Sequence, residues 1–194
     1  MSTSKPTYHH GDLRGALIAQ GLRLIEAGDA STLSLREVAR ATGVSATAVY
    51  RHFPDKRALM AALAEEGLAR LYEAQAAAAA APGNAFEATG RAYVRFALAQ
   101  PALFRLTFAY PDVLADPSGD AAGRLLHENA LALTGGDAAE AELLAMRAWS
   151  LVHGLAMLML DGRLPHDEAL IDATISAKGL FSNAPQGSSS EASP

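Results

Sequence analysis

The chain has 194 residues, half of them hydrophobic, and a formal net charge of −5 at pH 7. This composition allows one compact body or two small helical domains, each with a buried core. The absence of cysteine excludes disulfide frameworks, cysteine-based zinc sites and cysteine nucleophiles. Residues 1–10 are polar, unlike a secretory signal, and the longest apolar run, 149–160, is too short to cross a bilayer. We therefore expect a cytoplasmic protein without a membrane partner.

The charges are distributed unevenly along the chain. Residues 1–60 contain eight Lys or Arg and five Asp or Glu, a net charge of +3. The remaining residues contain eight basic and sixteen acidic side chains, a net charge of −8. A locally basic surface is sufficient to displace counterions from nucleic-acid phosphates, so the overall negative charge does not exclude DNA binding by the first 60 residues.

Helical spacing of apolar residues predicts the first three elements. Apolar positions over 13–25 predict a helix that a following glycine can end. Ser34 has capping-box spacing with the glutamate three residues later and opens a helix over 35–41. Gly43 breaks that helix, and a short third helix is predicted from 46 to about 52.

Proline, glycine and capping residues delimit the later elements, and no sustained alternation predicts a strand. The later predicted helices cover residues 54–81, 84–100, 101–108, 120–134, 137–161 and 166–181. Residues 110–119 are predicted to form a loop, residues 1–10 a flexible arm, and residues 183–194 a disordered tail. The predicted fold class is therefore all-α.

Residues 35–53 have the pattern of a helix-turn-helix. Ala39 is small enough for a crossing helix, Gly43 permits a left-handed turn, and Ser45 can cap the next helix. Val49 and Phe53, four residues apart, would bury the inner face of the third helix. Its outer face has small or hydrogen-bonding groups that fit a major groove, namely Ala46, Thr47, Tyr50 and Arg51. The alternative is a plain three-helix core with an incidental glycine turn.

Residues 11–71 resemble the DNA-binding domain of TetR-type regulators, and residues 8–14 resemble one branch of that family. The stretch Trp-Ser-Leu-Val-His-Gly at 149–154 is similar to the WHG-type ligand-binding domain of the same branch. The resemblance implies a nine-helix fold and a symmetric dimer. It also implies that a small molecule induces the regulated genes. It also implies an N-terminal DNA-binding domain at 11–71 and a C-terminal domain for ligand binding and dimerisation at 84–181.

The resemblance further implies which residues meet DNA. Tyr50 and His52 would bond phosphates, Lys56 would hold another, Arg36 would face the groove or backbone, and Thr47 would lie closest to base edges. The full expected set is Ser34, Arg36, Ser45, Ala46, Thr47, Tyr50, Arg51, His52 and Lys56. Many members have Gly or Ala at position 47 and often Thr at position 48. In this chain the threonine is at position 47 and alanine is at position 48, so the threonine hydroxyl is one residue earlier than in those members. The operator preferences of relatives therefore do not transfer.

The predicted helix 137–161 is apolar on two faces, as expected for a helix buried between two layers. The resemblance places the dimer contact on this helix and the next one. The expected contact residues are Leu144, Leu151, Gly154, Leu155 and Leu158, and the expected pocket residues are Phe104, Phe108, Met146, Trp149, His153 and Met157. Ordinary core packing is the alternative for the pocket residues, with His153 bonded to a backbone carbonyl. Which face serves the pocket and which serves the dimer is left open.

The leading interpretation is a repressor that a small, apolar effector releases from palindromic operator DNA. It needs no cofactor and no metal, because the adjacent His9 and His10 lack a third ligand and are expected in a flexible arm. One alternative is a helical DNA-binding dimer without ligand control. The other is a small helical enzyme with His153 as base near Asp161 or Glu128; the chain lacks a nucleophile–base pair at recognisable spacing, which favours a non-enzymatic protein.

Overall fold

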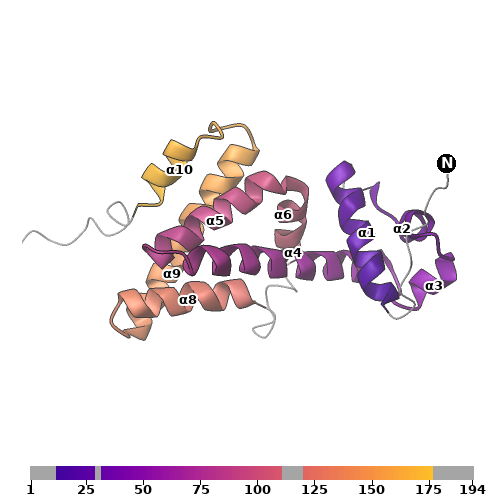
Figure 1. Ribbon diagram of the computed structural model, residues 1–194, viewed down its shortest axis with the longest axis horizontal. Coiled ribbons are helices and arrows are strands. Elements are labelled where there is room, and N and C mark those ends of the chain that lie inside the picture. The colour runs from indigo at the N-terminus through magenta and orange to yellow at the C-terminus, as the bar shows by residue number, and fades with distance from the viewer. Residues whose placement is uncertain (1–11, 29–31, 111–119, 177–194) are drawn as a thin grey trace, which may run out of the picture. The chain divides into compact units, whose positions relative to one another are not determined.

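A computed structural model describes residues 12–28, 32–110 and 120–176, which form nine α-helices and no strand (Figure 1). The helices are α1 (Leu13–Ala27), α2 (Leu35–Thr42), α3 (Ala46–Tyr50), α4 (Lys56–Ala79), α5 (Ala85–Ala99), α6 (Pro101–Phe108), α8 (Ala121–Leu133), α9 (Ala138–Leu160) and α10 (Glu168–Thr174). The all-α prediction is confirmed. The expectations of a flexible arm at 1–10 and a disordered tail at 183–194 fall outside the described residues, as does the predicted loop at 110–119 apart from Tyr110, which lies beyond the end of α6.

Two helices end earlier than predicted. The third helix ends at Tyr50, two residues before the predicted end at about His52, and the N–H groups of His52 and Phe53 both donate to the Val49 carbonyl oxygen at 2.9 Å. The last helix ends at Thr174, although the sequence predicted helix to residue 181. The next residue, Ile175, caps the helix by donating its N–H to the Ile171 carbonyl oxygen, and its side chain is buried next to Gly90 of α5. The predicted part beyond residue 176 lies outside the described residues.

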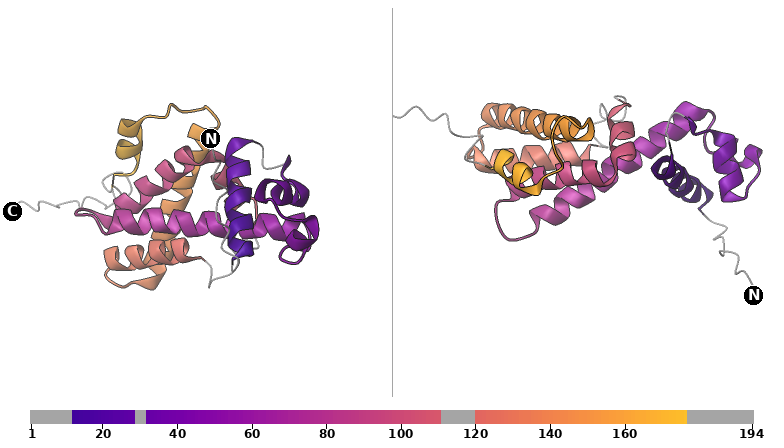
Figure 2. Two further views of the ribbon diagram at one scale, coloured as in Figure 1. Left: turned by 45° about the vertical axis from the view of Figure 1, so that its right-hand side comes forward. Right: turned by 90° about the horizontal axis from the view of Figure 1, so that it is seen from above.

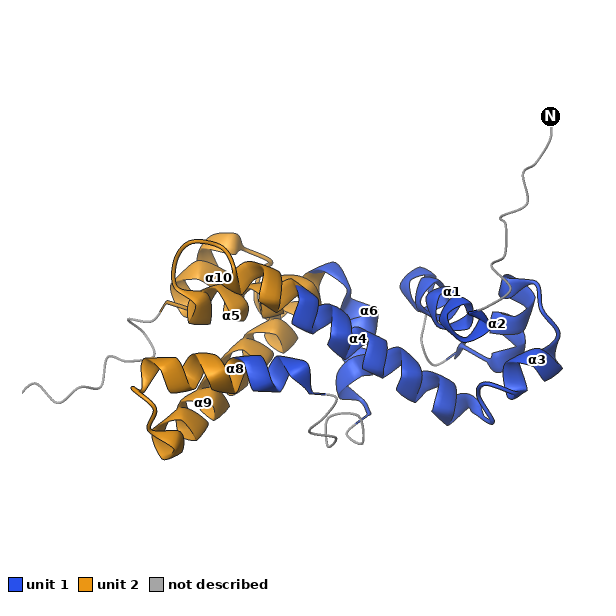
Figure 3. Cartoon of the chain, turned by 60° about the horizontal axis from the view of Figure 1, so that its bottom comes forward, with its two compact units in different colours: residues 1–73, 99–125 blue, residues 74–98, 126–194 orange. Residues whose placement is uncertain are grey.

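The chain divides into two compact units that are not contiguous in sequence (Figure 3). Unit 1 comprises residues 1–73 and 99–125, so α6 belongs with the N-terminal helices. Unit 2 comprises residues 74–98 and 126–194. The domain limits expected from the sequence, 11–71 and 84–181, remain predictions.

In unit 1, α1 and α3 both pack near α2, and α1 also packs against α6 (Figure 2). The N-terminal helices share a core whose largest fully buried members include Leu17, Val38 and Val49. Gly67 of α4 lies close to α6: a Cβ atom there would overlap the Thr107 hydroxyl oxygen. Glycine therefore permits the close approach of these two helices.

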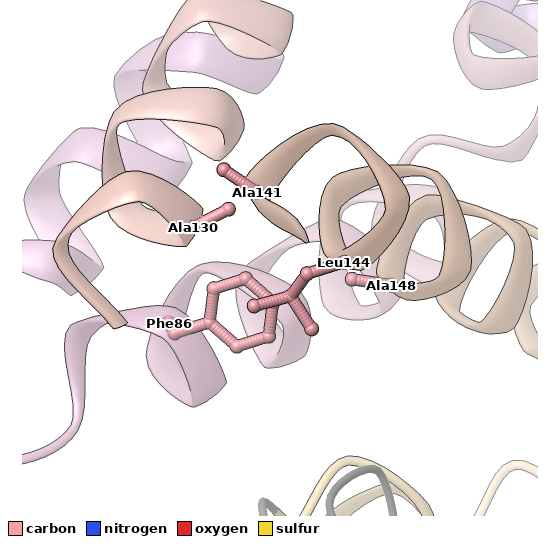
Figure 4. Packing of buried hydrophobic residues seen from close by; sticks show 5 residues of the cluster. All are labelled: Phe86, Ala130, Ala141, Leu144 and Ala148. Carbon is pink, nitrogen blue, oxygen red and sulfur yellow. The ribbon is translucent and has the colours of Figure 1, made fainter. Parts of the chain in front are cut away.

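In unit 2, α5, α8 and α9 meet around a small apolar cluster (Figure 4). The cluster consists of Phe86 from α5, Ala130 from α8, and Ala141, Leu144 and Ala148 from α9. Three of the five members are alanines, which let the helix backbones approach closely around one phenylalanine ring. An ion pair between Arg95 and Glu168, 2.7 Å apart, joins α5 to α10 at the surface of the same unit.

Candidate DNA interface and effector region

The turn between α2 and α3 has the capped geometry expected of a helix-turn-helix. The Ser34 hydroxyl oxygen accepts a hydrogen bond from the Glu37 N–H at 3.2 Å, which caps α2. Gly43 ends α2 with a φ of +76°, a left-handed conformation that favours glycine. The Ser45 hydroxyl oxygen accepts from the Ala48 N–H at 3.2 Å and caps α3. These contacts fix the direction in which α3 leaves the turn.

The two faces of α3 differ sharply in exposure. Val49 is fully buried, and Phe53, just beyond the helix, is 2% exposed, so both belong to the core of unit 1. Thr47 and Arg51 are exposed, and Tyr50 leaves 47% of its surface accessible. A partly exposed tyrosine on a capped helix presents a hydrogen-bonding face to solvent, as a groove-binding helix requires.

The structure places the expected DNA-binding residues together in unit 1. Eight of them are exposed, namely Ser34, Arg36, Ser45, Thr47, Tyr50, Arg51, His52 and Lys56, and Ala46 is half-buried. Ser34 and Ser45 already serve as helix caps through their hydroxyl oxygens. Their contacts with DNA, like those of the other seven, remain predictions.

Arg14 is a residue of this region that the sequence did not single out. It lies in the first turn of α1, and its guanidinium carbon is 5.5 Å from the centroid of the Phe53 ring. The contact joins the start of α1 to the end of the α3 segment. A buried aromatic ring such as that of Phe53 must pack against other side chains. The local sequence does not indicate that Arg14, 39 residues earlier, is one of them.

The expected effector residues fall in two groups. Phe104 is fully buried in α6, and its ring centroid is 4.8 Å from that of Phe108. Both belong to unit 1. In unit 2, the ring centroids of Trp149 and His153 are 5.9 Å apart. Met146, also on α9, is 55% exposed. Each unit thus brings together one pair of the expected residues.

Tyr93 of α5, which the sequence analysis missed, connects Trp149 with His153. Its hydroxyl oxygen is 2.7 Å from His153 Nδ1, and the Trp149 indole N–H donates to the same oxygen. Because indole is only a donor, the tyrosine oxygen accepts from Trp149, and the direction of its bond with Nδ1 follows the tautomer of His153. The hydroxyl group of a buried tyrosine needs a hydrogen-bond partner. A tyrosine within the apolar pattern of α5 was therefore the signal that could have identified Tyr93.

This cluster bears on the alternative interpretation of the Trp149–His153 pair as ordinary core packing, which remains a prediction. The partner of His153 Nδ1 is the hydroxyl group of the Tyr93 side chain. Trp149 is 44% exposed, so it is not a core tryptophan. Burial raises the pKa of Tyr93, because the ionised phenolate is penalised away from water. Burial also lowers the pKa of His153 below the ordinary value of 6.5, so the neutral form is favoured.

The lowered pKa of His153 predicts that acid destabilises unit 2. The unfolded state binds a proton at His153 more readily than the folded state does. Burial of the neutral imidazole therefore contributes its full share to stability only above pH 6.5. This contribution is lost as the pH falls from 6.5 through the lowered folded value. Trp149, the single tryptophan of the chain, allows unfolding to be followed by fluorescence at this cluster. We expect the free energy of unfolding in urea to decrease as the pH falls below about 6.5, and His153→Gln to reduce that decrease. An equal decrease in the variant would assign the pH dependence to other groups.

One side of α9 has accessible apolar side chains. Leu143, Met146 and Leu158 are between 45% and 55% exposed, and a Cβ atom added at Gly154 would meet no atom within 4 Å. By length and composition alone, α9 would pass as a membrane span, with a mean hydropathy of 1.6 in its best window. The core helix of a soluble protein can meet the same criteria.

The expected dimer residues lie on different sides of α9. Leu144 and Leu155 are 7% and 5% exposed and face the interior of their own unit. Leu151 and Gly154 are half-buried, and Leu158 is 47% exposed. Of the expected pocket residues on this helix, Met157 is half-buried. Within a single chain, the accessible face of α9 thus includes Leu158 and Gly154 but neither Leu144 nor Leu155.

Two family models match the chain. The model described as "Bacterial regulatory proteins, tetR family" matches residues 17–63. The model described as "Tetracyclin repressor-like, C-terminal domain" matches residues 86–177. A search among curated proteins found no match.

Solved structures are similar over most of the chain. A protein with unknown function from Rhodococcus sp. RHA1 is 33% identical, with a TM-score of 0.69 over 88% of this chain and 93% of that one. A variant TetR from Acinetobacter baumannii AYE in complex with minocycline is 19% identical, with a TM-score of 0.62 over 86% and 96%. A TetR family transcription regulator from Marinobacter aquaeolei VT8 is 19% identical, with a TM-score of 0.59 over 84% and 91%. The last two similarities concern the fold alone.

Proposed function

Because the chain belongs to the TetR family of bacterial regulatory proteins, we propose that it represses transcription by binding palindromic operator DNA as a homodimer. The observation that carries the proposal is the division of α3 into two faces. Val49 is fully buried, whereas Thr47, Tyr50 and Arg51 are exposed beside a capped turn. A helix that is anchored on one side and polar on the other can enter a major groove without unfolding its domain.

We further propose that a small molecule releases the dimer from DNA. The matching C-terminal family model is named for the tetracycline repressor, and one similar structure holds minocycline. In this chain, α9 has aromatic and methionine side chains at partly exposed positions, which suit an adaptable apolar site. A coupling free energy of about 1–3 kcal/mol between effector and DNA would weaken operator binding by about 5–150-fold.

The test begins with selection of binding sites from a random DNA pool by the purified full-length protein. An enriched inverted repeat would support operator recognition by a symmetric dimer. A panel of apolar compounds would then be screened for release of the selected duplex. Release by one compound supports the repressor mechanism, whereas DNA binding that no compound changes favours a DNA-binding dimer without ligand control. A pool without enrichment after several rounds would contradict sequence-specific binding.

We expect Thr47 and Tyr50 to affect DNA binding in different ways. Thr47 projects from the first turn of α3, where its hydroxyl and methyl groups can meet base edges. Thr47→Ala should lower discrimination at one base pair per half-site by about 1–3 kcal/mol at most. Tyr50→Phe should weaken binding to all sequences about equally, as the loss of a phosphate contact does.

Site selection with the two variants and the parent protein distinguishes these roles. An unchanged consensus for Thr47→Ala, together with a lower melting temperature, would show that Thr47 only supports its helix. A changed base preference at full affinity for Tyr50→Phe would contradict its assignment to phosphate.

A further inference from the structure

The guanidinium group of Arg14 is held at one edge of the helix-turn-helix. Its central carbon lies 5.5 Å from the centroid of the Phe53 ring, close enough for a cation–π interaction. The ring itself is 2% exposed, so its position is set by the core of unit 1. At the base of Arg14, the Asp12 carboxylate accepts a hydrogen bond from the Gly15 N–H at 2.8 Å and fixes the first turn of α1.

The chain positions around Phe53 relate Arg14 to the proposed phosphate contacts. His52 directly precedes Phe53, and Lys56 follows it by three residues at the start of α4. Phe53 lies between the end of α3 at Tyr50 and the start of α4 at Lys56. Through its contact with this ring, the guanidinium group of Arg14 is held at the segment that joins the two helices, although Arg14 is 38 residues away from His52 in the sequence.

The surroundings of Arg14 differ from those of Arg70 and Arg95. Arg70 pairs with Glu66, and Arg95 pairs with Glu168, so those charges are neutralised within the fold. Among the described residues, Arg14 has no carboxylate partner within ion-pair distance, and its guanidinium group lies over the face of an aromatic ring. A guanidinium on a ring face keeps the donors at its planar edge oriented for an anion, and its geometry suits two phosphate oxygens.

We propose that Arg14 is a DNA-positioning residue that binds a backbone phosphate beside the contacts of Tyr50, His52 and Lys56. The inference rests on the proposed DNA-binding function and adds a contact from α1, outside the helix-turn-helix. The competing explanation is that Arg14 only covers the Phe53 ring. A long apolar side chain would give the same cover, so the two explanations predict different effects when the charge alone is removed.

Two substitutions separate charge from cover. Arg14→Met keeps a long side chain over the ring and removes the charge, whereas Arg14→Lys keeps the charge and removes the planar fork. Arg23→Met is the matched control. Arg23 is also exposed on α1, but it is nine residues away, which places it on the opposite face of the helix.

The measurement is the affinity of each full-length protein for a random-sequence DNA duplex at several salt concentrations. Each lost phosphate contact should reduce the slope of log K against log salt concentration by about 0.9, or about 1.8 for both copies in a dimer. If the parent and the variant bind equally near 1 M salt, the variant should bind about eightfold more weakly than the parent at 0.1 M salt for each lost contact. Arg14→Lys and Arg23→Met should keep the parent slope, and thermal melting of each variant checks its folding.

Each outcome decides the matter. A reduced slope for a folded Arg14→Met variant, but not for Arg23→Met, supports the phosphate contact. An unchanged slope with a lowered melting temperature overturns it and leaves Arg14 as a cover for Phe53, while the DNA-binding function stands. Equal reductions for Arg14→Met and Arg23→Met would also overturn it, because they would indicate a diffuse charge effect. If the parent protein shows no salt-dependent binding at all, both this inference and the proposed function fail.

Discussion

Replacing Phe53 by alanine should destabilise the DNA-binding unit by about 3–5 kcal/mol, the usual cost of truncating a buried phenylalanine. The ring is 2% exposed and is among the largest fully buried side chains of the chain. Natural domains are stable by only about 5–15 kcal/mol, so this loss is a large fraction of the total. For a chain of this size, it corresponds to a decrease in melting temperature of roughly 6–20 °C.

Tyr50→Ala provides the matched control for Phe53→Ala. Tyr50 lies three residues earlier and is 47% exposed, so its truncation should change stability by only about 0.5 kcal/mol. Circular dichroism during heating measures both effects. Both variants should bind DNA poorly, but for different reasons. Phe53→Ala destabilises the DNA-binding unit, whereas Tyr50→Ala removes the proposed phosphate contact. A melting temperature of Phe53→Ala within about 2 °C of the parent value would contradict the role of this ring as a core anchor.

The elements that the sequence predicted well are those specified by local signals. Ser45 caps α3 through a neighbour three residues away, and Asp137 caps α9 through the N–H groups of Ala139 and Glu140. Gly43 adopts the left-handed conformation that the turn required. Each of these contacts joins residues within one helical turn, so residue type and spacing are sufficient to predict it.

The contacts that the sequence did not predict join distant segments. Tyr93 and His153 are 60 residues apart, and Arg14 and Phe53 are 39 apart. No local pattern encodes such a pairing, because it depends on how two helices pack. The end of α10 is a similar case: apolar spacing continues past Thr174, but the helix ends there, where Ile175 packs against Gly90 of α5.

The faces of α9 show a third limit of sequence reasoning. Apolar residues occur on several sides of this helix, so periodicity alone does not distinguish the interior from an intermolecular face. The structure resolves the ambiguity for Leu144 and Leu155, which are buried in their own unit, and for Leu158, which is not. The accessible side of α9 is therefore the place to test the proposed dimer contact.

Gly154→Leu should dissociate the proposed dimer while leaving the folded chain intact. In a single chain, a Cβ atom at position 154 meets nothing within 4 Å, so the larger side chain has space. Leucine is also a better helix former than glycine, which costs about 0.8–1.0 kcal/mol relative to alanine in a helix interior. If the α9 helices of two copies pack closely at this position, the leucines would overpack the contact at a cost of about 1–3 kcal/mol. That cost would raise the dimer dissociation constant by about 5–150-fold.

Sedimentation at decreasing protein concentration measures the dissociation constant, and urea unfolding measures the stability of the chain. Gly154→Ala is the graded control, because a methyl group should disturb a close helix contact less than an isobutyl group. An intact dimer of Gly154→Leu at dilute concentration would place Gly154 outside the contact. A variant that is less stable in urea as well as monomeric would indicate misfolding instead of a lost interface.

The same variant links dimerisation to DNA recognition. A symmetric dimer binds two half-sites of a palindrome at once, so the second half-site is engaged at a high effective concentration. A monomer keeps the α3 face, with Thr47, Tyr50 and Arg51 unchanged, but binds each half-site independently. Gly154→Leu should therefore lose affinity for the selected inverted repeat and retain the affinity of one subunit for a single half-site. Equal losses on both duplexes would show that the leucine damages the DNA-binding face itself, because dissociation of the dimer leaves half-site binding unchanged.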